Sequence, residues 1–378
     1  MTFTAIDHTY MQRALALAKR GLYTTAPNPR VGCVLVANGE VVGEGFHVKA
    51  GEPHAERNAL LAAGDNARGA TCYVTLEPCS HTGRTGPCAD ALIDAGVHRV
   101  IAAMEDPHSK VAGQGFAKLR AAGIQVDVGL LESEARALNS GFIRRMETGR
   151  PYVRIKLAMS LDGRTAMASG ESKWITGDAA REDVQHWRAC SSAIISGIGT
   201  VLADDPSLTV RPQSWRALTY PDVAVRQPVR VILDRSLKIP MTAKLLGEAG
   251  QTLLVSGQDD SGTAAEHAGA LTQKGGELIY LPSSGSGIDL AALLDELGRR
   301  ECNDVLVEAG PTLAAAFVRE GLFDELLIYM APTLLGSSAR ALLAMPELEK
   351  MSEQIKLTLF DCVQIGDDLR LRYQPVRC

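Results

Sequence analysis

Apolar and polar positions alternate along residues 8–128 in a way that predicts helices and strands in turn. The segment "HTYMQRALALAKRG" has helical spacing and stops at Gly21. Two short apolar runs in "VGCVLVANGEVVGEGFH" surround Asn38-Gly39, a dipeptide that favours a hairpin turn. A helix is expected to begin near His54, followed by the strand "ATCYVTLEPC". Two helix–glycine–strand units come next, "CADALIDAG" into "VHRVIAAM" and "GFAKLRAAG" into "IQVDVG". This alternation predicts a layered α/β domain with some parallel strands.

The pattern restarts after the polar stretch "RRMETGRP", residues 144–151. A strand "YVRIKLAMS" turns at Asp162-Gly163, and later apolar runs are "SAIISG", "VRVILD", "TLLVSG", "ELIYLP", "DVLVEAG" and "ELLIYMAP". Helical patterns intervene in "TGDAAREDVQHWRA" and "IDLAALLDELGRRE". A chain of 378 residues is also too long for one ordinary core. We therefore expect two α/β domains, at residues 1–147 and 148–378.

The composition narrows the class of protein. A hydrophobic content of 46% with 22% charged residues is typical of a globular protein. The net charge of −5 gives no basic footprint, so we expect no nucleic-acid partner. No apolar run approaches the ~18 residues that cross a bilayer, and "ALALA" is too short for a signal peptide. We expect a cytoplasmic protein, in which clustered cysteines indicate metal binding or catalysis.

His54, Cys79 and Cys88 form a ligand set typical of a catalytic zinc site. His54 and Glu56 open the helical segment in "GEPHAERNAL", while Cys79 and Cys88 flank "SHTGRTGP". One nitrogen and two sulfur ligands leave a fourth position for water, whose pKa zinc lowers toward neutrality. Helix starts at His54 and Cys88 would help to stabilise a thiolate. We expect one Zn²⁺ per chain, with Glu56 carrying a proton from that water to a leaving nitrogen.

Sequence alone leaves two alternatives for this site. His-x-Glu followed by Pro-Cys resembles the zinc-dependent nucleobase deaminases, whose signature has two residues between the cysteines, whereas this chain has eight. In one alternative Cys88 is only a buried thiol and His81 completes the site. In the other the zinc is purely structural, which leaves Glu56 without a role.

Four polar residues near the cluster are candidate substrate contacts. His81 and Arg84 lie in the inter-cysteine loop, and an arginine fork recognises a phosphate well. Asn28 lies between two prolines in "APNPRVG", where it is held for hydrogen bonding to a heterocycle, and His47 ends "EGFH". The alternatives are a solvated Arg84 and an Asn28 that only forms a turn.

The motifs "PNPRVGCVLV", "GEPHAERNAL", "TLEPCSHTGRTGPC" and "EDPHSKVAGQG" resemble the deaminase half of the bifunctional riboflavin-biosynthesis deaminase/reductase family. "KLAMSLDGRTAMASGESKWITG", "TVLADDPSLTVR" and "VEAGPTLAAAF" are similar to its reductase half, and the long inter-cysteine loop is characteristic of the family. The resemblance implies a cytidine-deaminase-like three-layer domain followed by a dihydrofolate-reductase-like α/β domain. It implies deamination of 2,5-diamino-6-ribosylamino-4(3H)-pyrimidinone 5′-phosphate, then reduction of the ribosyl group by NADPH to give 5-amino-6-ribitylamino-uracil 5′-phosphate.

The resemblance also implies site residues in the second half. The NADPH contacts would be Ala158, Trp174, Thr200, Asp204, Arg235, Gly310, Pro311, Thr312, Leu313, Ala314, Ala315 and Ala316. The substrate contacts would be Ser172, Arg188, Leu208, Arg211 and Glu308. Lys156 and Glu308 are candidates for proton handling, and Arg235 would meet the 2′-phosphate of NADPH. From the residues alone, Lys156 could instead face outward and the arginines could form structural ion pairs.

Two rival functions remain from the residues. One is a deaminase of another free base or nucleotide fused to a folate-type reductase, and a free base would not need phosphate-binding arginines. The other is an RNA-editing or regulatory binding protein that uses the zinc fold only as a module, and the net negative charge does not favour it. A homodimer or homotetramer through the second domain would suit the family.

Overall fold

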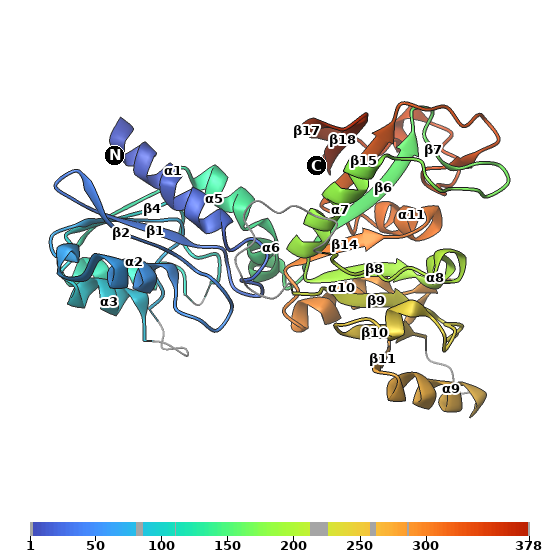
Figure 1. Ribbon diagram of the computed structural model, residues 1–378, viewed down its shortest axis with the longest axis horizontal. Helices are drawn as coiled ribbons and strands as arrows, with labels where there is room; N and C mark the ends of the chain where they lie inside the picture. The colour runs from blue at the N-terminus through green and yellow to red at the C-terminus, as the bar shows by residue number, and fades with distance from the viewer. Residues whose placement is uncertain are drawn as a thin grey trace. The chain divides into compact units, whose positions relative to one another are not determined.

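The computed structural model describes residues 3–80, 86–109, 111–211, 226–257, 262–285 and 287–376 (Figure 1). The chain divides into two compact units, one up to Arg150 and one from Pro151. Each unit has its own sheet and its own core of buried apolar side chains. Among the described residues, no helix is long and apolar enough to cross a membrane.

The first unit is built on a sheet of order β2-β1-β3-β4-β5 within the described residues. Its strands are β1 (Gly32–Ala37), β2 (Glu40–Phe46), β3 (Thr71–Val74), β4 (Arg99–Ala102) and β5 (Gln125–Val128). β1 pairs antiparallel with β2 and β3, whereas β3, β4 and β5 are parallel. The expected hairpin forms at Asn38 and Gly39, which both have positive φ, as a tight turn of this kind requires.

Helices cover both faces of this sheet, which makes the unit three layers deep (Figure 1). The helices are α1 (Ala5–Lys19), α2 (Ala55–Ala63), α3 (Cys88–Asp94), α4 (Gln114–Ala121), α5 (Glu132–Leu138) and α6 (Ser140–Thr148), with a 3₁₀ turn η1 (Gly64–Ala67). α1 and α5 lie on one face, and α2 and α3 lie on the other. Glycine lets both faces pack closely: a Cβ at Gly32 would collide with the backbone of Ala14 in α1, and one at Gly45 with that of Ala55 in α2.

The stretch expected to be a polar linker begins inside a helix. α6 runs to Thr148 and ends at Gly149, which has a φ of 75° and so accepts the left-handed conformation that stops a helix. The expected boundary between residues 147 and 148 therefore falls in the last turn of α6. Arginine, methionine and glutamate are good helix formers, so much of the polar stretch is helical, and the two units divide at its end, between Arg150 and Pro151.

The second unit is built on a larger sheet of order β11-β10-β9-β8-β14-β6-β15-β18-β17 within the described residues. The strands from β11 to β15 in this order are parallel, and β18 and β17 add an antiparallel edge. The strands are β6 (Tyr152–Ser160), β8 (Ala193–Gly197), β9 (Val229–Leu233), β10 (Thr252–Ser256), β11 (Gly276–Tyr280), β14 (Asp304–Glu308), β15 (Glu325–Ala331), β17 (Leu357–Ile365) and β18 (Asp368–Pro375).

Short elements lie outside this sheet. They are the strands β7 (Arg164–Ala166), β16 (Arg340–Ala341), β12 (Ser283–Ser284) and β13 (Gly287–Ile288), and the 3₁₀ turns η3 (Lys244–Leu246) and η4 (Met351–Glu353). β7 pairs with β16, and β12 with β13. The β12–β13 pair lies at the Ser/Gly-rich segment "SSGSG", which begins at Ser283.

Helices lie on both faces of the large sheet. They are α7 (Asp178–Cys190), α8 (Ile198–Asp204), α9 (Gly262–Gln273), α10 (Leu290–Arg299) and α11 (Pro311–Arg319). Trp187 of α7 and Leu271 of α9 belong to one apolar cluster, whereas Leu293 of α10 and Phe317 of α11 belong to the other. Both faces of the parallel strands are therefore buried, as is usual for a parallel sheet.

Candidate functional site

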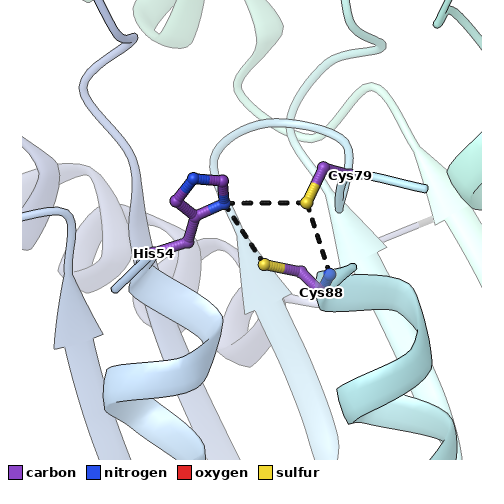
Figure 2. A group of neighbouring side chains, drawn as sticks. All are labelled: His54, Cys79 and Cys88. Atoms are coloured by element: carbon purple, nitrogen blue, oxygen red, sulfur yellow. Dashed lines mark hydrogen bonds between the residues drawn. The ribbon is translucent and has the colours of Figure 1, made fainter. Parts of the chain in front are cut away.

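Three side chains from separate elements meet in the first unit (Figure 2). His54 is the residue immediately before α2, Cys79 follows the end of β3, and Cys88 is the first residue of α3. The expected helix starts at His54 and Cys88 are thus confirmed. A parallel strand and two helix starts place the three ligand atoms within 4.8 Å of one another.

The spacing of these atoms fits tetrahedral zinc. His54 Nδ1 lies 3.6 Å from Cys79 Sγ and 3.4 Å from Cys88 Sγ. Zn–N and Zn–S bonds of about 2.1 and 2.3 Å would place tetrahedral nitrogen and sulfur ligands roughly 3.6 Å apart. An imidazole and two thiol groups are also donors that zinc prefers. Both the donor set and its spacing therefore suit zinc.

The surroundings of the thiols favour a thiolate. Hydrogen bonds from Cys88 and His54 outweigh burial and lower the pKa of Cys79, whose Sγ also accepts the backbone N–H of Cys88 at 3.3 Å. The hydrogen bond with Cys79, together with burial, raises the pKa of Cys88. A metal ligand must be deprotonated, so a cation at this site would complete the ionisation of the pair.

Glu56 lies in the first turn of α2, beside the ligands but outside the His54–Cys79–Cys88 group. Its side chain is 3% exposed. Burial, reinforced by the charge of Cys79, raises the pKa of Glu56 to about 7. A carboxyl group with a pKa near neutrality can both accept and donate a proton at physiological pH.

Two of the four expected substrate contacts join this group. Asn28 Nδ2 lies 3.1 Å from His47 Nε2, and the ring of His47 meets that of His54 edge-on with centroids 5.3 Å apart. Pro53 O lies 3.1 Å from His47 Nδ1, so this nitrogen donates and Nε2 accepts from Asn28. Burial lowers the pKa of His47, which favours this neutral form. The other two, His81 and Arg84, lie outside the described residues.

A second cluster lies in the other unit. Lys156 of β6 and Glu308 of β14 are direct neighbours across the parallel pair of strands. Arg188, near the end of α7, binds both carboxylate oxygens of Glu308, with Nε and Nη2 at 2.6 and 2.8 Å. Burial raises the pKa of Glu308, but the charge and hydrogen bonds of Arg188 outweigh it and lower this pKa. Burial lowers the pKa of Lys156.

The segment that carries Leu208 and Arg211 lies against α7. Arg188 Nη1 donates to Thr209 O at 2.9 Å, and the backbone N–H of Arg211 donates to Gln185 at 2.9 Å. Leu208 is buried, whereas Arg211 is exposed and its charge lowers the pKa of Glu308. Four of the five expected reductase substrate residues are thus gathered here: Arg188, Leu208, Arg211 and Glu308. The fifth, Ser172, is half-buried and lies in the segment before α7.

The carboxyl ends of β8 and β14 form the place where a nucleotide is expected. β8 and β14 are neighbours in the sheet. The chain continues from β8 to β9 on one side and from β14 to β15 on the other, so the strand order reverses between β8 and β14. Ligands of open α/β sheets bind at such a point. Gly310 ends the loop after β14 and precedes α11, and a Cβ there would meet no atom within 4 Å. No side chain caps the N-terminus of α11, and a helix N-terminus suits a phosphate.

The other expected cofactor positions differ in exposure. Trp174 is 70% exposed with Arg181 stacked on its ring, and the adjacent Lys173 forms an ion pair with Asp204 at 3.2 Å. Residues at least partly exposed are Ala158, Thr200, Arg235, Gly310, Pro311, Thr312, Leu313 and Ala316. Ala314 and Ala315 are buried in the core of the unit.

Sequence reasoning missed three residues that support the second cluster. Tyr329 presents its ring to the Lys156 ammonium group at 5.9 Å, and its hydroxyl donates to Asp183 at 2.5 Å. Asp183 also accepts from Trp187 Nε1 at 3.3 Å. Asp183 and Trp187 are four residues apart in "REDVQHWRA". This spacing does not indicate that Tyr329 of β15, more than 140 residues away, is their partner.

Two family models match the chain. The model described as cytidine and deoxycytidylate deaminase zinc-binding region matches residues 4–104, and the RibD C-terminal domain matches residues 151–371. The chain is 50% identical to the riboflavin biosynthesis protein RibD of Escherichia coli, over 97% of this chain and 98% of that protein. It is 52% identical to the protein of the same name from Haemophilus influenzae, over 99% of each.

Solved structures agree with this assignment. Acinetobacter baumannii RibD has a TM-score of 0.87 and 49% identity, and the match covers 98% of this chain and 99% of that chain. A diaminohydroxyphosphoribosylaminopyrimidine deaminase/5-amino-6-(5-phosphoribosylamino)uracil reductase from Thermotoga maritima has a TM-score of 0.83 and 33% identity, with the same coverage. The resemblance inferred from the motifs and the two-domain α/β fold are confirmed. The chain belongs to the RibD family, the bifunctional deaminase/reductases of riboflavin biosynthesis.

Proposed function

We propose that the first unit deaminates 2,5-diamino-6-ribosylamino-4(3H)-pyrimidinone 5′-phosphate and that the second reduces the ribosyl group of the product to ribityl with NADPH. The final product is 5-amino-6-ribitylamino-uracil 5′-phosphate. The observation that carries this proposal is the His54–Cys79–Cys88 group with Glu56 beside it. A hydrolytic zinc site needs three protein ligands and a proton carrier, and the first unit contains both.

In the first reaction, His54, Cys79 and Cys88 would hold one zinc ion. Zinc supplies an activated water at neutral pH. Glu56 takes the proton from that water and gives it to the departing amino group, and its pKa of about 7 suits both transfers. This role needs a buried carboxyl group close to the ligands that does not itself bind the metal.

Substrate recognition falls to the polar residues around the ligands. Asn28 and His47, fixed to each other by a hydrogen bond, present one edge to the heterocycle. His81 and Arg84 of the inter-cysteine segment complete the set, and Arg84 binds the 5′-phosphate by its guanidinium fork. The phosphate is the feature that distinguishes this substrate from a free base.

In the second reaction, Lys156 and Glu308 handle the proton while the sugar is reduced. NADPH supplies the hydride. The ring of the glycosylamine opens to an imine, and protonation of that imine by Lys156 makes C1′ electrophilic. Arg188 keeps Glu308 ionised beside Lys156, and the exposed Arg211 binds the substrate phosphate with Ser172 and Leu208 lining the same region.

NADPH would bind at the carboxyl end of the sheet around β8 and β14. Gly310, Pro311, Thr312 and Leu313 at the start of α11 would hold its phosphates, and Ala314, Ala315 and Ala316 follow in the same helix, the first two buried. Ala158, Trp174, Thr200 and Asp204 contact the rest of the cofactor. Arg235, exposed at the end of β9, pairs with the 2′-phosphate and so selects NADPH over NADH.

The experiment that tests this proposal supplies the diamino-pyrimidinone phosphate with and without NADPH. Ammonia release and NADPH oxidation are followed separately. Ammonia should appear in both samples, and NADPH should be consumed only after ammonia has formed. Ammonia from a free pyrimidine base at an equal rate would instead favour the deaminase of another base.

We also propose that the chain acts as a homodimer or homotetramer in the cytoplasm, where its thiol ligands stay reduced. The edge strand β17 supports an oligomer, because it exposes Leu359, Phe360 and Val363 together with the backbone of a sheet edge. Light scattering during gel filtration gives the mass directly. Phe360→Lys should shift that mass toward the monomer if this edge is the interface.

A further inference from the structure

Glu77 is a buried carboxylate two residues before the ligand Cys79, and neither proposed reaction uses it. Its side chain is 4% exposed. The carboxylate accepts backbone N–H groups at 2.8–3.4 Å from Asp106, Gly113, Gly115 and Phe116. These donors belong to "EDPHSKVAGQGF", residues 105–116, of which Lys110 lies outside the described residues. A carboxylate that satisfies so many amides fixes that segment and the first turn of α4.

The same segment touches the peptide that leads to the metal ligand. A Cβ built on Gly115 would lie only 2.0 Å from the carbonyl oxygen of Pro78, so α4 begins directly against this peptide. The backbone N–H of Glu77 donates to Met104 O at 3.0 Å, just beyond β4. Pro78 is thus held from one side by the anchored backbone of Glu77 and from the other by Gly115.

Cys79 has little freedom once Pro78 is fixed. Its carbonyl oxygen accepts the N–H of Ala89 at 3.1 Å, and its Sγ accepts the N–H of Cys88 at 3.3 Å. A shift of Pro78 would therefore be passed to the Sγ of Cys79 and to its 3.6 Å spacing from His54 Nδ1. That spacing is the dimension that matches tetrahedral zinc.

We propose that Glu77 is a positioning residue of the metal centre: by clamping Asp106 and residues 113–116 against Pro78, it sets the place of the Cys79 thiolate. This rests on the proposed function only in that Cys79 is a zinc ligand. This role gives a reason for the motif "EDPHSKVAGQG" in the deaminase half, although none of its residues takes part in the proposed reaction. Groups that orient metal ligands change metal affinity by about 10–100-fold when they are removed.

The test compares two variants of the full chain with a matched control. Glu77→Gln keeps the shape of the side chain but removes its charge and places an NH₂ group against backbone donors. Gly115→Ala removes no hydrogen-bonding group, but its Cβ would press on Pro78 O and would lie 3.1 Å from Glu77 Oε1. Asp7→Asn is the control, because Asp7 is also buried in the first unit and also accepts a backbone N–H, from Thr4 at 2.9 Å.

Zinc release to a chromogenic chelator and the visible spectrum of the Co²⁺-substituted protein are measured for each variant, together with thermal unfolding. Glu77→Gln and Gly115→Ala should release zinc about tenfold faster or more and shift the thiolate–cobalt bands. Asp7→Asn should lower the unfolding temperature and leave both readouts unchanged.

Zinc release and cobalt bands like those of the wild type in Glu77→Gln would overturn the proposal. An equally faster release of zinc from Asp7→Asn would also overturn the proposal, because a general loss of stability would then explain the release. If Glu77→Gln does not fold, Gly115→Ala carries the test. Zinc release and cobalt bands like those of the wild type in Gly115→Ala would then overturn the proposal. A wild-type chain that binds no zinc would instead refute the proposed function itself.

Discussion

The metal cluster and the Lys156–Arg188–Glu308 cluster are assembled in different ways. The metal ligands lie within residues 54–88 and come from one strand end and two helix starts. Lys156, Arg188 and Glu308 span residues 156–308 and meet only because β14 is inserted beside β6 in the large sheet. Short spacing produces a motif that can be recognised in the sequence, whereas a site made by sheet topology has no such motif.

The two clusters also use charge differently. Around the metal ligands, burial and a neighbouring thiolate raise the pKa of Glu56 toward 7. In the second cluster, the bidentate contact with Arg188 lowers the pKa of Glu308, so this carboxylate stays ionised. The first arrangement suits a group that both accepts and donates a proton, and the second suits an ionised carboxylate that assists proton transfer by the neighbouring lysine.

The largest expected effect separates chemistry from metal binding in the first unit. Glu56→Gln should lower ammonia release by about 10³-fold, because the amide can no longer carry a proton. Zinc content by atomic absorption should stay at about one ion per chain. Loss of zinc from this variant would make Glu56 a ligand and would remove the proposed contrast between the clusters.

The second unit should respond separately to acid. Glu325 is fully buried; burial raises its pKa, but the charges of Arg154 and Arg372 outweigh burial and lower it to about 2. Its stabilising contribution is therefore full above the unfolded pKa of 4.5 and is lost as the pH falls toward 2. Glu325→Gln should destabilise this unit by about 3 kcal/mol at pH 7 and flatten its loss of stability in acid.

Urea unfolding between pH 2 and 7, followed by tryptophan fluorescence, measures this effect. Trp187 is a suitable reporter because Arg154 and Arg372 stack on its ring at 4.6 and 4.8 Å. Ammonia release at pH 7 is the control and should be unchanged in Glu325→Gln. An acid dependence equal to that of the wild type would show that Glu325 is not the group that titrates.

Replacing a metal ligand should weaken zinc binding strongly. Cys88→Ser should weaken zinc binding by at least about 100-fold, more than the loss of an orienting group. His81→Ala should keep the zinc. Competition with a chelator of known affinity gives both values, and the opposite order would move the third ligand into the inter-cysteine segment.

The smallest expected effect concerns cofactor choice. Arg235→Ala should raise the Michaelis constant for NADPH by about tenfold and leave that for NADH nearly unchanged, since one charge-assisted contact to the 2′-phosphate is lost. Lys238→Ala, a change of another exposed cation on the same segment, is the control. Equal changes for both nucleotides would remove Arg235 from the phosphate site.

Much of the fold could be predicted from the sequence, and the exceptions have physical causes. The Asn38-Gly39 hairpin and the helix that begins at Cys88 follow from local turn and capping preferences. The hairpin of β17 and β18 was missed because β17 exposes apolar side chains on both faces, so it lacks the alternation of a half-buried strand. Local patterns do not encode which elements become neighbours.

The same limit applies to the sites. His54, Cys79 and Cys88 could be identified from residue type and spacing. The sequence left open whether Arg188 binds a ligand or a carboxylate, and the structure gives it Glu308 as a partner. Glu77 was overlooked although it lies in "TLEPC", because its partners are backbone amides, which no residue type reveals.

The central claim is that each reaction is carried by its own unit. Glu308→Gln tests it most directly, with ammonia release measured on the diamino substrate and NADPH oxidation measured on the deaminated product. NADPH oxidation should fall by about 100-fold while ammonia release stays at the wild-type rate. Loss of both activities in a protein that keeps its circular dichroism and its zinc would contradict the claim, and a single shared site would have to replace it.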